Sequence, residues 1–213
     1  MHLIHRGIVN NFFKENLLIS FKQSFKKGYG VETDIHATKD NEFICFHDFT
    51  LKRILKRNLS VKNLNYSKIK EISTKLGKPI PLLKDLLKAS NNKHSLFIEI
   101  KPLFSKSVLK KLIEETSRYT KCVFISFKHE NIFQLLSINK STKVGLSFCP
   151  PTSIKKIIEK SNDPKINCLI LDKTYLINRK IQKLKIKKYY YTIKTKTDLY
   201  KYKKNNNLIF ENL

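Results

Sequence analysis

Residues 32–48, ETDIHATKDNEFICFHD, place acidic side chains and histidines between hydrophobic residues that alternate as in a β-strand. Glu32 and Asp34 are two residues apart, so their side chains lie on the same face of an extended segment. The polar residues 39–42 predict a hairpin with a two-residue turn. In that register Asp34 pairs with His47, which predicts a carboxylate and a histidine facing each other across the hairpin.

Apolar runs of strand length recur along the whole chain, at residues 2–5, 31–35, 95–100, 122–126, 143–148, 167–171, 188–193 and 207–210. Helical periodicity lies between them, at residues 14–26, 82–89, 106–117, 130–137, 152–160, 177–184 and 197–203. This alternation predicts right-handed βαβ units and a parallel sheet. With the hairpin counted as an extension of the second strand, the strands number eight, which predicts a closed (β/α)8 TIM barrel. A doubly wound open sheet is the alternative, but no glycine-rich phosphate loop follows the first strand.

The segments outside this alternation carry three further expectations. Residues 49–78 are polar and rich in lysine, which predicts a long loop with one short helix near residues 67–73. Only three residues follow the last strand, so we expect a single domain over residues 1–213 without the final outer helix of the barrel. Apolar surface would be left uncovered there, so we expect either that neighbouring helices spread over it or that a second subunit covers it in a homodimer.

The composition is strongly basic, with 43 basic and 17 acidic residues and a formal net charge of +26. Lysines are spread along nearly the whole chain, which favours a generally basic solvated surface over a specific nucleic-acid groove. No apolar run reaches membrane-spanning length, and no signal peptide is evident. The four cysteines lie in apolar runs without paired spacing, which predicts buried reduced thiols and a cytoplasmic protein.

The residues most suited to chemistry follow the first strands, where a barrel of this type has its active site. They are His5, Arg6, Glu32, Asp34, His47, Glu99 and Lys101. Three carboxylates facing one cavity repel each other unless a cation holds them, and an all-oxygen set suits Mg²⁺ or Ca²⁺. Histidines beside the cation suit general acid and base catalysis, and the basic side chains suit the charge of a phosphate diester.

In order and spacing, these residues resemble the motifs of the glycerophosphodiester phosphodiesterase family. The resemblance rests on His5-Arg6-Gly7, Glu15-Asn16, Glu32-Thr33-Asp34, Thr38-Lys39-Asp40, His47-Asp48, Leu51, Ile80-Pro81-Leu82 and Glu99-Ile100-Lys101. It implies a TIM barrel, a divalent cation held by Glu32, Asp34 and Glu99, and an acid and base pair of His5 and His47. It also implies that Lys101 lies near the phosphate. The implied reaction hydrolyses a small-molecule glycerophosphodiester to an alcohol and glycerol 3-phosphate.

The chain departs from the family pattern near its end. The family usually has Trp-Thr-x-Asn on the seventh strand, where residues 191–194 read Tyr-Thr-Ile-Lys. Glu211 stands where an aspartate is usual. Tyr191 is expected to keep the aromatic wall of the substrate pocket, whereas Lys194 is longer and charged, so the alcohol or glycerol side of the site is expected to differ.

Other functions remain open at this point. The same barrel suits a lysophospholipase D or a cyclising phospholipase C type of activity. A basic protein that binds RNA or a membrane without catalysis would rest on the charge alone, and steep salt dependence of binding would be its mark.

Overall fold

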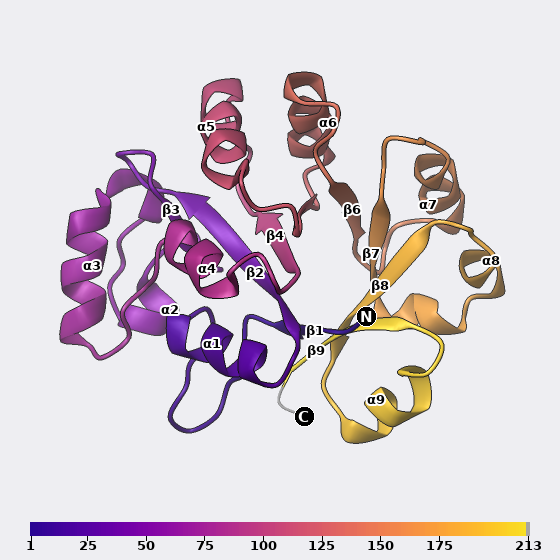
Figure 1. Cartoon of the computed structure of the whole chain (residues 1–213), viewed down its shortest axis with the longest axis horizontal. Coiled ribbons are helices and arrows are strands. Elements are labelled where there is room, and N and C mark those ends of the chain that lie inside the picture. The colour runs from indigo at the N-terminus through magenta and orange to yellow at the C-terminus, as the bar shows by residue number, and fades with distance from the viewer. Residues whose placement is uncertain (212–213) are drawn as a thin grey trace.

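The computed structural model of the chain describes residues 1–211, in which eight parallel strands close into a barrel (Figure 1). The strands are β1 (Leu3–His5), β2 (Gly30–Ala37), β4 (Leu96–Ile100), β5 (Cys122–Ser126), β6 (Val144–Phe148), β7 (Cys168–Asp172), β8 (Lys187–Ile193) and β9 (Asn207–Phe210). The barrel is closed because β1 pairs in parallel with both β2 and β9. The predicted (β/α)8 TIM barrel is therefore confirmed.

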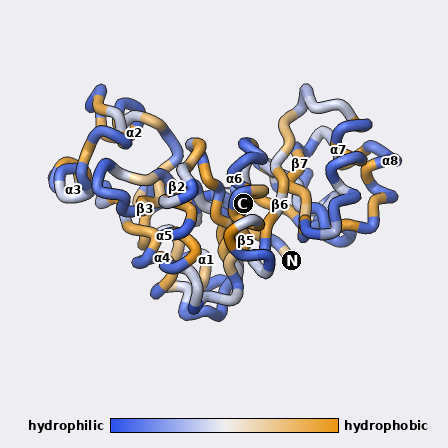
Figure 2. The backbone as a smooth tube through the Cα atoms, turned by 90° about the horizontal axis from the view of Figure 1, so that it is seen from above, coloured by the Kyte–Doolittle hydropathy of each residue, from blue (hydrophilic) through white to orange (hydrophobic). Residues whose placement is uncertain are grey.

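Helices surround the barrel and cover its outer face (Figure 1). They are α1 (Leu18–Lys26), α4 (Leu83–Ser90), α5 (Lys106–Thr116), α6 (His129–Ile138), α7 (Ile154–Ser161), the 3₁₀ helix η2 (Lys173–Ile177), α8 (Arg179–Gln182) and α9 (Lys196–Tyr202). Parallel strands covered in this way are buried on both faces, which explains their nearly continuous apolar sequences. Figure 2 shows polar residues prevailing on outer helices such as α3 and α7.

Two apolar clusters hold the barrel together. The larger cluster fills the layer between strands and helices, and a smaller one fills the inside of the barrel. The inner cluster contains Leu3, Phe97, Ile125, Cys168, Ile170, Tyr189 and Ile209. Because these side chains plug the barrel below the catalytic end, the polar residues above them stand on a rigid floor.

The hairpin that extends β2 has a different register from the predicted one. The returning strand β3 (Phe43–Cys45) pairs Ile35 with Cys45, so Asp34 lies opposite Phe46 and not His47. The Phe46 N–H donates to the Asp34 carbonyl at 2.9 Å. Asn41 adopts the left-handed conformation, with φ 58°, which gives the turn one residue more than a two-residue loop. His47 lies beyond β3, and its position does not depend on strand pairing.

The segment predicted as a long loop, residues 49–78, is largely ordered structure. It contains α2 (Lys52–Leu55), the 3₁₀ helix η1 (Val61–Asn63) and α3 (Tyr66–Lys75). A satellite cluster under it buries Ile44, Phe46, Leu51, Leu55, Val61, Ile69, Ile80 and Leu82. The loop prediction was wrong because the many lysines concealed these widely spaced apolar residues.

The connection after β1 holds the histidine and arginine at the end of that strand. Gly7 has φ 76°, and a Cβ there would lie 2.8 Å from the backbone carbon of Ser20 in α1. Asn16 is also left-handed, with φ 56°, and its N–H donates to the Arg6 carbonyl at 2.9 Å. The helix therefore begins at Leu18 and not at residue 14, because the preceding residues fold back onto the loop.

The face beside the last strand contains an apolar groove between α1 and α9. The groove has a volume of about 300 Å³ and is lined by Ile4, Ile8, Val9, Lys27, Tyr29, Leu199 and Phe210. Residues 212–213, which belong to the predicted short end after the last strand, lie outside the described residues. Whether an outer helix completes the barrel there stays a prediction, as does the second subunit.

Two further predictions concern the cysteines and the membrane. Cys45, Cys122 and Cys168 are buried free thiols, as expected. Cys149 is exposed, contrary to expectation, because it lies past the end of β6 in the loop before α7. Within residues 1–211, no helix is both long and apolar enough to cross a bilayer.

Candidate active site

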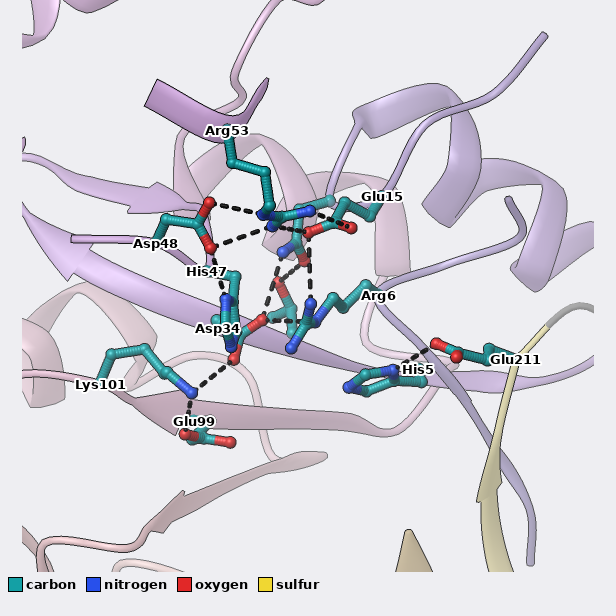
Figure 3. Close-up of polar contacts among 12 residues, drawn as sticks. His5, Arg6, Glu15, Asp34, His47, Asp48, Arg53, Glu99, Lys101 and Glu211 are labelled. Carbon is teal, nitrogen blue, oxygen red and sulfur yellow. Dashed lines mark hydrogen bonds and ion pairs between the residues drawn. The ribbon is translucent and has the colours of Figure 1, made fainter. Parts of the chain in front are cut away.

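A cavity of about 420 Å³ opens at the carboxyl ends of the barrel strands. It brings together all but one of the eight side chains singled out from the sequence, namely His5, Arg6, Glu32, His47, Glu99, Lys101 and Tyr191. The eighth, Asp34, lies beside them with its side chain 1% exposed. Figure 3 shows six of these residues, His5, Arg6, Asp34, His47, Glu99 and Lys101, gathered at one end of the barrel, with Glu211 from the end of β9 beside His5.

Three carboxylates form the acidic centre of this cavity. Each of Glu32, Asp34 and Glu99 offers one oxygen, and these oxygens lie within 4.8 Å of one another. The arrangement follows from strand geometry, because Glu32 and Asp34 share a face of β2 and Asp34 is the register partner of Glu99 on β4. The three carboxylates are thus brought together by backbone pairing alone.

Burial and mutual repulsion strongly perturb these acids. Burial raises the pKa of Glu32 well above its ordinary value, and the charge of Asp34 raises it further. The same two causes raise the pKa of Glu99 to about 7. Burial also acts to raise the pKa of Asp34, but Arg6 and Lys101 outweigh it and hold that pKa below its ordinary range. Burial and repulsion thus raise the pKa of two of the three acids, and added positive charge would favour their ionised form.

The unsatisfied oxygens of the triad indicate where a cation fits. Glu32 Oε2 and Asp34 Oδ1 are buried and accept no hydrogen bond, although Lys101 Nζ lies 3.4 Å from Asp34 Oδ1. Buried carboxylate oxygens without hydrogen bonds are costly, and a hard divalent cation accepts several such oxygens as ligands. The donor set contains oxygen only, which suits Mg²⁺ or Ca²⁺ better than zinc. The acidic triad is thus a candidate site for a divalent cation.

Two basic side chains border the triad. Arg6 Nε lies 2.9 Å from Asp34 Oδ2, and Lys101 Nζ lies 2.7 Å from Glu99 Oε1 and 3.4 Å from Asp34 Oδ1. Burial acts to lower the pKa of Lys101, but the two carboxylates outweigh it and raise that pKa. Both cations stay charged and line the cavity, where an anionic group of a ligand can reach them.

His5 is oriented by a glutamate from the last strand. Its Nδ1–H donates to Glu211 Oε2 at 2.9 Å, while its Nε2 lies 3.7 Å from Glu32 Oε2. The hydrogen bond from His5 lowers the pKa of Glu211 to about 2, aided by Lys194, whose Nζ is 2.9 Å from Glu211 Oε1. An ionised carboxylate only accepts, so Nδ1 carries the proton and Nε2 is left to exchange protons in the cavity.

His47 has a matching arrangement from a different part of the chain. Its Nδ1–H donates to Asp48 Oδ1 at 2.6 Å, and Arg53 of α2 donates to Asp48 Oδ2 at 2.7 Å. Arg53 also reaches Glu15 Oε1 at 2.6 Å, which ties α2 to the loop after β1 (Figure 3). Burial lowers the pKa of His47, against the opposing charge of Asp34. A neutral His47 thus presents Nε2 as a free base.

The wall opposite the triad comes from the strands of the second half. Tyr191 donates to the Phe148 carbonyl at 2.9 Å, and its ring meets Phe127 edge to face with centroids 5.8 Å apart. Thr192 and Lys194 complete this wall, and the Lys194 side chain is 65% exposed. This side of the cavity combines aromatic surface with one solvated positive charge.

Comparison with known proteins identifies the group to which this fold and cavity belong. The model of the glycerophosphoryl diester phosphodiesterase family matches residues 5–209. The chain belongs to this family. A glycerophosphodiester phosphodiesterase of Caldanaerobacter subterraneus is 27% identical over 68% of this chain and 65% of its own length. Human lysophospholipase D GDPD1 is 31% identical over 56% of this chain and 42% of its own length.

Solved structures of the family share the fold closely. The crystal structure of a glycerophosphodiester phosphodiesterase from Thermotoga maritima superposes with a TM-score of 0.82 at 20% identity, over 98% of this chain and 92% of that one. At 20% sequence identity, the similarity between the two structures shows a common barrel fold. The match to the two curated relatives above spans about two thirds of the length of the first and about two fifths of the length of the second.

Several side chains that support the site had no assigned role from the sequence. Arg53 has none because it lies in the segment predicted as a loop. Phe127 stands in Ser126-Phe127, which fits the family resemblance, but the resemblance gives it no role at the cavity. Asn16, which belongs to one of the motifs of the resemblance, supports the acidic triad. It bridges Asp34 Oδ2 at 3.3 Å and the Thr33 hydroxyl at 2.8 Å, and the helix that follows has no side-chain cap.

His36 supports the backbone of the segment that carries His47. It is buried, its Nε2 meets the His47 carbonyl at 3.1 Å, and its ring packs against Phe49. Burial lowers the pKa of His36 to about 4, so it stays neutral near neutral pH. The hairpin and the loop after His47 enclose the ring, so His36 lies neither on the rim of the cavity nor on the surface.

Proposed function

We propose that this protein hydrolyses glycerophosphodiesters to an alcohol and glycerol 3-phosphate, with His5 and His47 as the acid and base pair. The observation that carries the proposal is the placement of two histidines, each with Nδ1 held by a carboxylate, beside an acidic triad in one cavity. Family membership supports the reaction class.

The histidines supply the proton transfers. With Nδ1–H bonded to Glu211 or Asp48, each neutral ring presents Nε2 as a base and each protonated ring presents it as an acid. One histidine removes a proton from water or from the glycerol 2-hydroxyl, and the other protonates the oxygen of the departing alcohol. If the 2-hydroxyl attacks, a cyclic phosphate forms, and water activated by a histidine then opens it to glycerol 3-phosphate. The supporting carboxylates favour the charged ring that forms when a histidine takes up a proton.

The charged groups of the cavity bind the phosphate. Arg6 and Lys101 donate to its oxygens and offset the charge that develops as the ester bond breaks. Glu32, Asp34 and Glu99 would hold a divalent cation, Mg²⁺ or Ca²⁺, which supplies Lewis-acid polarisation of a phosphate oxygen. Tyr191 forms the wall against which the glycerol or alcohol part of the substrate rests.

A substrate panel with and without a chelator tests reaction, metal and substrate together. Glycerophosphocholine and glycerophosphoethanolamine should yield glycerol 3-phosphate in Mg²⁺ or Ca²⁺ and almost none in chelator. Activity unaffected by chelation would remove the role of the acidic triad. Release of choline phosphate in place of choline would show cleavage of the other ester bond.

A lysophospholipase D activity is the second candidate. The edge-to-face pair of Phe127 and Tyr191 gives the cavity an apolar side, and Phe127 is exposed at its opening. An acyl chain leaving the cavity would pass along such a side. Lysophosphatidylcholine in the same panel discriminates, and phosphorus NMR of the product separates both readings from a cyclising reaction, which gives a cyclic phosphate.

We also propose a cellular location and an oligomeric state for the enzyme. The first is a cytoplasmic location, without a specific nucleic-acid partner. The second is a homodimer in which another copy covers the groove between α1 and α9. Sedimentation equilibrium decides the second, because a strict monomer at micromolar concentration is incompatible with it.

A further inference from the structure

The guanidinium of Arg53 in α2 joins two carboxylates that come from different parts of the chain (Figure 3). Its Nε and Nη2 donate to the two oxygens of Asp48 at 2.7 and 3.0 Å. Its Nη2 and Nη1 donate to the two oxygens of Glu15 at 2.6 and 3.1 Å. Both pairs are therefore bidentate, a geometry that the planar fork of arginine provides and lysine does not.

Each of the two carboxylates also holds a side chain of the active-site cavity. Asp48 Oδ1 accepts the Nδ1–H of His47 at 2.6 Å, and Glu15 Oε1 accepts from Nη1 of Arg6 at 3.3 Å. His47, Arg6 and Glu15 line the cavity, whereas Arg53 lies outside it. A continuous path of hydrogen bonds thus runs from His47 through Asp48, Arg53 and Glu15 to Arg6.

The backbone that carries Arg53 is firmly held. Leu51 and Leu55, two residues to either side, are 0% and 1% exposed and belong to the satellite cluster under residues 49–78. The side chain of Arg53 itself is 48% exposed, and a single ion pair at such a site contributes little. Two bidentate pairs on one guanidinium form a network, in which the geometry of both partners is fixed.

Without Arg53 the two carboxylates would repel each other. Burial acts to raise the pKa of Asp48, but hydrogen bonds from Arg53 and His47 outweigh it and lower that pKa. Burial likewise acts to raise the pKa of Glu15, and the bond from Arg53 with the charge of Arg6 outweighs it. Both groups are thus anions near neutral pH, and both lie within 3.0 Å of the same Nη2. Loss of the shared cation leaves two adjacent anions free to separate.

We propose that Arg53 is a positioning residue that fixes His47 relative to Arg6. It acts through Asp48 and Glu15 and contacts no substrate. In the proposed function, on which this role rests, His47 transfers a proton and Arg6 binds the phosphate, so their spacing must match one phosphodiester. A misplacement of about 1 Å in such a pair can cost up to about 10²-fold in rate.

The cation behind the other histidine is held differently. Lys194 Nζ contacts Glu211 Oε1 at 2.9 Å, and its side chain is 65% exposed. An ammonium on a flexible stem provides no planar fork, and this contact links it to the last strand alone. We therefore assign the positioning role to Arg53 and not to Lys194.

Steady-state kinetics on glycerophosphocholine with Mg²⁺ tests the role. R53A should lower kcat about 10 to 100-fold and change KM by less than about threefold. R53K should stay at least about fivefold below the parent, because an ammonium cannot bridge both carboxylates. R57A, which removes another exposed arginine of the same segment, is the matched control and should turn over as the parent does. Parent activity in R53A or R53K, or an equal loss in R57A, overturns the proposal.

Chemical rescue separates positioning from a general effect on the fold. Guanidinium chloride at about 50 mM, far below denaturing concentrations, should raise kcat of R53A at least about threefold, whereas methylammonium should not. Absence of rescue, or equal rescue by both cations, contradicts the bridging role. The loss in R53A/E15Q should be smaller than the product of the losses in R53A and E15Q, because the two residues act in one path. Independent losses that multiply would show that Arg53 does not act through Glu15.

Proton NMR measures the position of His47 without turnover. Its short Nδ1–H bond to Asp48 should give a downfield resonance at low temperature that His47→Ala lacks. This resonance should persist in R57A and should shift or broaden in R53A, or in R53K where R53A does not fold. An unchanged resonance overturns the proposal. A parent that hydrolyses no glycerophosphodiester would overturn the proposed function, and the resonance would then decide on the positioning of His47 by itself.

Discussion

The two sides of the active-site cavity are built on different principles. On the side of β1, β2 and β4, three acids and two cations compensate one another in a buried network. On the side of β8 and β9, Tyr191 packs against Phe127, and Lys194 stands 65% exposed with Glu211 as its partner. A buried network cannot lose one charge without leaving another uncompensated, whereas an exposed charge is screened by water.

This difference explains where the chain departs from its family. The motif series is intact on the buried side, and the unusual residues Lys194 and Glu211 both lie on the open side, next to each other at 2.9 Å. A lysine can be accommodated there because solvent shares its charge. We therefore expect changes on the buried side, and loss of the contact between Glu211 and His5, to lower activity, whereas a change of the exposed Lys194 should alter substrate preference.

The largest effect should come from the histidines. His5→Ala and His47→Ala should each lower kcat on glycerophosphocholine by ~10²-fold or more, because each removes a proton-transfer group from the reaction. His129→Ala is the control, since His129 bonds the Ser147 carbonyl outside the cavity. Full activity of either site variant would refute the acid and base assignment.

Loss of one acid should come next. Glu32→Gln removes a candidate metal oxygen and leaves the side chain nearly isosteric, so Mg²⁺ or Ca²⁺ should bind at least about tenfold more weakly. Isothermal titration calorimetry measures the affinity directly. Glu42→Gln, on the surface with Lys84 and Lys111, is the matched control. An unchanged affinity in Glu32→Gln would exclude this residue as a ligand.

The sequence predicts the residues of the buried side of the cavity better than those of the open side. Glu32, Asp34 and Glu99 were predicted because strand alternation puts two of them on one face and parallel pairing adds the third. The role of Glu211 was not, since its contact with His5 spans 206 residues and depends on β9 closing against β1. The predicted closure of the barrel could have indicated this contact, because closure places Glu211, at the end of the last strand, beside His5, at the end of the first.

The hairpin shows a different limit. The sequence predicts His47 beside Asp34 from a hairpin register that the structure does not have. The left-handed Asn41 adds a residue to the turn and shifts the register by one, yet His47 still lines the cavity. A shift of one residue reverses the faces of a strand. The prediction of position survived because His47 lies beyond β3, where hydrogen bonds to Asp48 and His36 determine its place.

Glu211 and Asp48 each accept a hydrogen bond from Nδ1 of a histidine, so substitutions of these two carboxylates can be compared directly. Glu211→Gln and Asp48→Asn each keep an acceptor for Nδ1–H but remove the charge that favours a protonated ring. Each should lower kcat by about 10 to 100-fold with little change in KM. Steady-state kinetics on one substrate tests both. A KM effect without a kcat effect would mean that these carboxylates bind substrate and do not orient histidines.

The pH dependence of metal affinity should be a smaller effect of the buried side. With its pKa raised to about 7, Glu99 is neutral below that pH in the metal-free protein and must lose its proton to bind a cation. Affinity should therefore fall at least about tenfold for each pH unit below 7, because Glu32, whose pKa is also raised, must lose its proton as well. Calorimetry in buffers of different ionisation enthalpy counts the released protons. An affinity that does not change between about pH 6 and 7 contradicts this coupling.

The smallest effect should come from Lys194 on the open side. Lys194 contacts Oε1 of Glu211, while Oε2 holds His5, so Lys194→Asn should leave kcat within about threefold of the parent. Removal of the positive charge should lower KM for glycerophosphocholine relative to glycerophosphoglycerol, because only choline carries a cation. The ratio of kcat/KM for the two substrates measures this preference. If Lys194→Asn abolishes turnover of both, then Lys194 belongs to the catalytic network, and the division between a buried catalytic side and an open substrate side is wrong.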